Sequence, residues 1–110
     1  MPPADEPHAS VRLDPASVPA RIVLAGIVGS FHSDELYFTC LSALERKTAV
    51  DVMCAEVEHL GGSAVQILLA FRQALAEQSL GFRLQAVPPR LATQLRDAGV
   101  GGPFDLGGAT

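Results

Sequence analysis

Three stretches rich in β-branched and apolar residues recur along this chain of 110 residues, at 21–28, 49–57 and 82–87. Each has the length of a strand, and a segment with helical spacing follows each of them. This alternation predicts an α/β fold with parallel strand pairs joined by right-handed crossovers. A short alternating segment at 11–13 predicts one more strand, at an edge of the sheet.

The strand predictions carry details that a structure can test. The segment 21–28 is apolar almost throughout, which predicts a strand covered on both faces. Gly26 within it predicts a bulge or a close backbone approach. The last main strand is expected to run to Val87, because Pro88 stops it.

Capping signals set the expected helix boundaries. Ser33 precedes two acidic residues and is expected to cap the first helix. The buried face of that helix is expected to carry Leu36, Cys40, Leu41 and Leu44. The second helix is expected over 63–78. The third is expected to have Pro89 at its first position and Gly99 as its αL cap.

Composition narrows the function classes. The net charge is −4, and eight Lys and Arg residues are scattered without a cluster, which argues against nucleic-acid binding and against an anionic membrane surface. No apolar run approaches the roughly 20 residues of a membrane span, and no secretory signal is visible, so a cytoplasmic protein is expected. Cys40 and Cys54 are expected to be buried free thiols.

The order of these elements, with the residues that form them, resembles the STAS domain, the fold of bacterial anti-sigma-factor antagonists. Three places carry the resemblance: Leu24–Val28 followed by a helix from Ser33, Val57–Gln66, and Phe82–Val100. It implies a STAS-like α/β fold, with a mixed sheet of about four strands flanked by about three or four helices. The STAS domain is expected over residues 11–106, between flexible tails at 1–10 and 107–110.

Gln66 points to a subgroup within that family. The segment 63–69, Ser-Ala-Val-Gln-Ile-Leu-Leu, is similar to small STAS proteins found beside chemotaxis or two-component genes. The STAS subunit of Mla-type phospholipid transporters is a more distant comparison.

The phosphorylation motif of the resembled family is altered here. Aligned with the family's Asp-Ser-Ser-Gly-Leu, this chain reads Gly-Gly-Ser-Ala-Val over residues 61–65. The phosphorylated hydroxyl falls on Gly62 and the preceding acid on Gly61. A second family acid falls on Met53. Only the second hydroxyl, Ser63, is present, so the usual phosphoswitch is altered or lost.

Two interpretations of Ser63 stay open. At a helix N-terminus, a phosphate on Ser63 would be favoured by unpaired N–H groups and by the helix dipole. Alternatively, Ser63 and Gln66 form a capping box, in which the hydroxyl and the amide satisfy two backbone donors. Ser63 is therefore a candidate phosphoacceptor or a helix cap.

The loops that follow parallel strands meet at one edge of a sheet, where α/β folds commonly bind. In the resembled family this edge docks the partner kinase. The expected partner-binding residues are Phe31, His32, Ser33, Glu56, Glu58, Gly61, Gly62 and Ala64.

The sequence favours an interaction module over an enzyme. No catalytic constellation is apparent, and the three histidines have no partner at metal-ligand spacing, so neither a metal nor a cofactor is expected. The resemblance implies a regulatory partner: a histidine-kinase-like serine kinase or an anti-sigma factor. The alternatives are a subunit supporting the ATPase of an Mla-like ABC transporter and an orphan STAS protein without a phosphoswitch.

Overall fold

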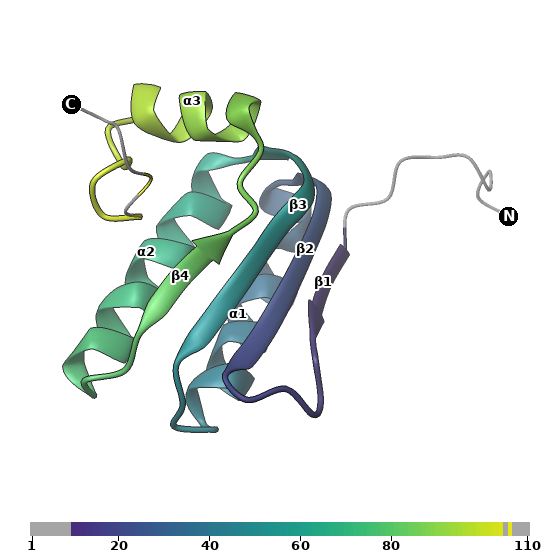
Figure 1. Ribbon diagram of the computed structural model, residues 1–110. Helices are drawn as coiled ribbons and strands as arrows, with labels where there is room; N and C mark the ends of the chain where they lie inside the picture. Colours follow the sequence, from purple (N-terminus) through teal and green to yellow (C-terminus); the bar gives the residue numbers. More distant parts are fainter. Residues whose placement is uncertain (1–9, 105, 107–110) are drawn as a thin grey trace, which may run out of the picture.

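The computed structural model describes residues 10–104 and residue 106. In chain order the elements are β1 (Ser10–Leu13), β2 (Ala20–Val28), the 3-10 turn η1 (Ser30–His32), α1 (Ser33–Leu44), β3 (Val50–Leu60), α2 (Gly62–Glu77), β4 (Phe82–Gln85) and α3 (Pro89–Asp97) (Figure 1). This order confirms the predicted alternation. Residues 1–9 of the tail expected at 1–10, and the tail expected at 107–110, lie outside the described residues, whereas Ser10 belongs to β1.

The strands form one mixed sheet in the order β1-β2-β3-β4. The edge strand β1 pairs antiparallel with β2, with Val11 opposite Leu24. The pairs β2–β3 and β3–β4 are parallel, with Ile22 beside Val52 and Val52 beside Leu84. The predicted STAS-like α/β architecture is confirmed.

The helices α1 and α2 lie side by side on one face of the sheet, and α3 lies at the end where β3 leads into α2 (Figure 1). The strand order explains this arrangement. From β2 to β4 each crossover moves one strand in the same direction, and right-handed crossovers in one direction place their helices on one face.

The expectation that β2 is covered on both faces is therefore wrong. Ile22, Leu24 and Val28 are fully buried beneath the helices. On the opposite face of β2, Arg21 is exposed and Ile27 is 55% exposed. Among the described residues, no helix covers that second face, so apolar character along β2 did not reveal which side is buried.

Bulges make β3 longer than expected. Its register against β2 shifts between Val23 and Ala25 and again between Gly26 and Ile27. Gly26 has a φ of 76°, which confirms the bulge predicted there. These shifts carry β3 on to Leu60, directly into the start of α2.

The strand β4 is shorter than expected and ends at Gln85. Ala86 follows with a φ of 57°, a left-handed conformation that turns the chain out of the sheet. The predicted boundaries of α3 are confirmed. Pro89 opens the helix, and Gly99 and Val100 close it with N–H bonds to the carbonyls of Arg96 and Leu95.

Both cysteines are buried free thiols, as predicted. Cys40 lies on the inner side of α1, and Cys54 lies on β3 in the core. Burial raises the pKa of the Cys40 thiol from its ordinary value of 9.0 to about 12. Burial has the same effect on the pKa of Cys54. Neither thiol therefore forms the reactive thiolate at neutral pH.

No helix within the described residues is long and apolar enough to cross a membrane.

We expect both thiols of the folded protein to react slowly with a disulfide reagent at about pH 8 and quickly once guanidinium chloride unfolds the chain. Stability should also fall as pH rises above 9.0, because the unfolded thiols ionise before the buried ones do. The rate of thiol labelling and the urea midpoint against pH measure these effects. Equal labelling rates in the folded and unfolded states would contradict the burial of both thiols.

Candidate functional site

The turns that follow β2 and β3 are packed against each other at one end of the sheet. The Gly61 N–H donates to the Val28 carbonyl at 2.8 Å. A Cβ placed on Gly61 would lie 3.2 Å from the Gly29 Cα, which is backbone that cannot move aside freely. Glycine at position 61 therefore permits this close approach, and the approach draws the starts of α1 and α2 together.

Two serine hydroxyls meet where those helices begin. The Ser33 Oγ donates to the Ser63 Oγ at 2.9 Å, and both residues are half-buried. Ser33 is the first residue of α1 and Ser63 is the second residue of α2. The pair joins segments 30 residues apart in the sequence.

The capping-box prediction for Ser63 is wrong. Helix α2 begins one residue earlier than expected, with Gly61 at the N-cap and no side chain hydrogen-bonded to that cap. The Ser63 hydroxyl contacts Ser33 instead, and Gln66 is exposed. Ser33 does not cap α1 either, because His32 takes the N-cap position without a side-chain cap bond.

The structure brings only some of the predicted partner-binding residues together. Phe31 in η1 is 99% exposed. It lies beside His32, whose Nδ1 accepts a hydrogen bond from the Gly29 N–H at 3.4 Å. With Ser33, Gly61, Gly62 and Ser63, these two residues form what we call the junction surface. Ala64 is fully buried, so its side chain is not available to a partner.

Glu56 and Glu58 lie apart from the junction surface. Both are exposed on the second half of β3, and both line a hollow whose other wall is 88–90, at the start of α3. No hydrogen bond among the described residues joins either carboxylate to Ser33 or Ser63. The predicted partner-binding residues therefore form two separate groups at one end of the sheet, the junction surface and the pair of carboxylates on β3.

Sequence reasoning missed Gln94, which fixes the end of β3. Its Nε2 donates to the Leu60 carbonyl at 2.6 Å, and its Oε1 accepts from the Leu60 N–H at 3.3 Å. Leu60 is fully buried, so both backbone groups need a partner. The side chain from α3 thus acts in place of a neighbouring strand just before the junction surface.

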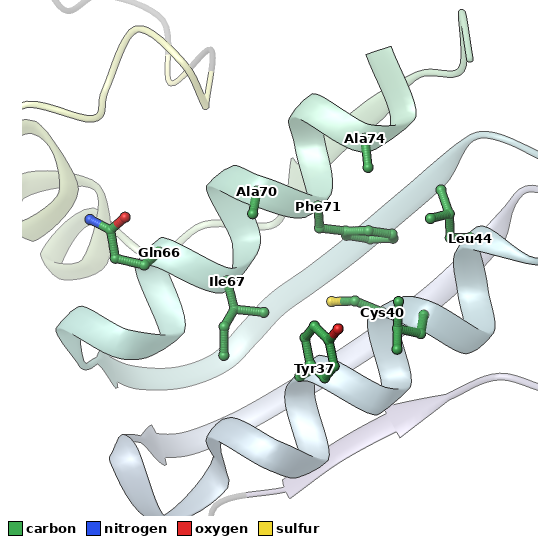
Figure 2. Close-up of a pocket in the computed structure, with 9 residues that line it drawn as sticks. Tyr37, Cys40, Leu44, Gln66, Ile67, Ala70, Phe71 and Ala74 are labelled. Carbon is green, nitrogen blue, oxygen red and sulfur yellow. The ribbon is translucent and has the colours of Figure 1, made fainter. Parts of the chain in front are cut away.

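Sequence reasoning also missed an apolar groove between α1 and α2. Its volume is about 390 Å³. Its lining includes Tyr37, Cys40, Leu44, Ile67 and Phe71 (Figure 2). Leu41, expected on the buried face of α1, also lines the groove and is 39% exposed. Apolar side chains are therefore left open between the two helices.

The junction surface offers two hydroxyls and a glycine-rich backbone. Among the described residues, no cluster of three His, Cys, Asp or Glu side chains could hold a metal ion. No acid or base is hydrogen-bonded to either serine within residues 10–104. The arrangement supplies hydroxyl and backbone groups for hydrogen bonding.

Paired glycine substitutions test the close approach. We expect Gly61→Ala to lower the free energy of unfolding by about 1–3 kcal/mol, because the added methyl presses on the Gly29 backbone. Gly62→Ala should raise it by about 0.4–1 kcal/mol, since its Cβ meets nothing within 4 Å and lies in a helix. Urea unfolding measures both. Equal effects of the two variants would contradict the packing described for the turns.

Comparisons with known proteins agree with this fold. The family model described as "Mlab, STAS domain" matches residues 11–107. The phosphorylated form of SpoIIAA, a cell fate determinant of Bacillus, superposes with a TM-score of 0.68 at 15% identity, over 86% of this chain and 87% of that one. The unphosphorylated form of the anti-sigma factor antagonist SpoIIAA gives a TM-score of 0.69 at 15% identity, over 86% of each chain. No curated protein matches the chain in sequence. With most of its length matched by the family model, this chain belongs to the STAS domain family.

Proposed function

We propose that this STAS domain is a cytoplasmic, non-enzymatic interaction module of bacterial signalling. It binds a regulatory serine kinase or anti-sigma factor through the junction surface. The observation that carries the proposal is the Ser33–Ser63 hydroxyl pair beside a phenyl ring that is 99% exposed. Large aromatic side chains are common anchors of protein interfaces. Phe31 therefore supplies apolar contact area, and the serines supply a polar site that can be modified.

Ser63 is the proposed phosphoacceptor. Its hydroxyl lies in the first turn of α2, where free backbone N–H groups and the helix dipole favour a phosphate. A phosphoryl group there adds about −1.5 to −2 charges and takes the place of the proton on the oxygen that Ser33 now contacts. Its effect would reach the start of α1 through that contact.

A second candidate function rests on two observations. The matching family model carries the description "Mlab", and glycine stands at the position of the family's phosphorylated hydroxyl. Both favour a constitutive STAS subunit that supports the ATPase of an Mla-like phospholipid transporter. In that case the junction surface would bind its partner without phosphorylation.

Intact mass of the chain after incubation with its partner kinase and ATP tests the first proposal. We expect one added phosphate on the wild type and on Ser33→Ala, and none on Ser63→Ala. Ser33 is the matched control because it is half-buried, and its hydroxyl is hydrogen-bonded to Ser63.

A phosphate on Ser33, or none with an active kinase, would contradict the assignment of Ser63. Co-purification of a transporter ATPase equally with wild type and with Ser63→Ala would support the second function instead. Phe31→Ala should weaken the binding of either partner at least about tenfold, because an interface anchor worth about 1.4 kcal/mol is lost.

A further inference from the structure

The strand β3 extends well beyond its neighbour β4 (Figure 1). Pairing between them ends at Met53 and Gln85, although β3 continues to Leu60. The left-handed conformation of Ala86 then turns the chain away from the sheet. The second half of β3 is thus left without a strand on this side.

The far end of this open edge is satisfied. Gln94 makes both hydrogen bonds to Leu60 that an adjacent strand would have made. Between Met53 and Leu60, no hydrogen bond joins β3 to the connection 86–90 in the described part of the chain. The unpaired segment is therefore bounded by β4 at one end and by Gln94 at the other.

A hollow of about 510 Å³ lies along this segment. Residues 55–58 of β3 form one wall, and Pro88, Pro89 and Arg90 form the other. Two wall residues, Ala55 and Glu58, also have no partner in the register with β2. We call this hollow the β3 notch.

The backbone chemistry of the notch suits one kind of occupant. An unpaired strand edge presents a row of N–H and C=O groups to a further strand. Pro88 and Pro89 supply no N–H from the opposite wall. At about 3.3 Å per residue, the stretch from Cys54 to His59 has room for about four or five residues of extended chain.

We propose that the β3 notch binds an extended peptide segment of a partner protein, which adds to β3 as a parallel or antiparallel strand and carries a basic residue toward Glu56 and Glu58. Both carboxylates are exposed, and neither has an ion-pair partner among the described residues. Arg90 on the facing wall would repel a uniformly basic peptide. The segment is therefore expected to hold one or two basic residues among β-branched ones.

This inference deepens the proposed function, because Glu56 and Glu58 were among the expected partner-binding residues. It does not involve Ser63. A partner held at both places would contact the junction surface with its folded part and the β3 notch with an extended segment.

A phage-displayed library of random heptapeptides, selected on the immobilised full chain, provides the probes. Peptides enriched by selection are synthesised and titrated into the 15N-labelled chain. We expect the amide signals of residues 54–59 to shift most. Two series of peptides N-methylated at alternate residues are compared. We expect the series whose methyl groups face β3 to bind at least tenfold more weakly, since it cannot complete the strand hydrogen bonds.

A charge reversal completes the test. The double substitution Glu56→Lys with Glu58→Lys should weaken binding of the selected peptides at least tenfold. The control Glu77→Lys changes an exposed residue at the end of α2 and should leave their affinity unchanged. Failure to enrich any peptide, shifts centred away from 54–59, or unweakened binding by both N-methylated series would each overturn the proposal. Phosphorylation of Ser63 by the partner kinase would still support the proposed function in those cases.

Discussion

The close approach of Gly29 and Gly61 is the constraint on which this end of the molecule depends. The 2.8 Å hydrogen bond from the Gly61 N–H to the Val28 carbonyl holds the two turns together, and a Cβ on Gly61 would lie only 3.2 Å from the Gly29 Cα. Each turn leads directly into a helix, so both helices begin side by side. The Ser33–Ser63 contact follows from that placement. The packing of the two turns thus sets the position of the hydroxyl pair.

The single direction of the strand order has a second consequence. Both crossover helices occupy one face of the sheet, and the other face is left to side chains such as Arg21, Asp51 and Arg83, which lie in one row across the parallel strands. The buried Asp51 pairs with Arg83 at 3.4 Å. The unpaired second half of β3 and the exposed Phe31 both lie at the end of the sheet where α3 is placed (Figure 1).

Local patterns were enough to predict the elements, because hydrophobic spacing and the breakers at Gly99 and Pro89 act over a few residues. Contacts between distant segments were not predictable in this way. Gln94 and Leu60 are 34 residues apart, and a polar residue on a short helix carries no local sign that it will bind a strand end. The N-cap predicted at Ser63 lies two residues earlier, at Gly61, because packing of Gly61 against Gly29 sets where α2 begins.

Under the proposed function, partners bind at the end of the sheet where α1 and α2 begin. This is tested by following the amide signals of the 15N-labelled chain while the kinase or ATPase that co-purifies with the chain is added. Broadening and shifts are expected to concentrate on residues 29–33 and 61–63. Changes centred instead on the open sheet face, at Arg12, Arg21 and Arg83, with the junction unaffected, would contradict it.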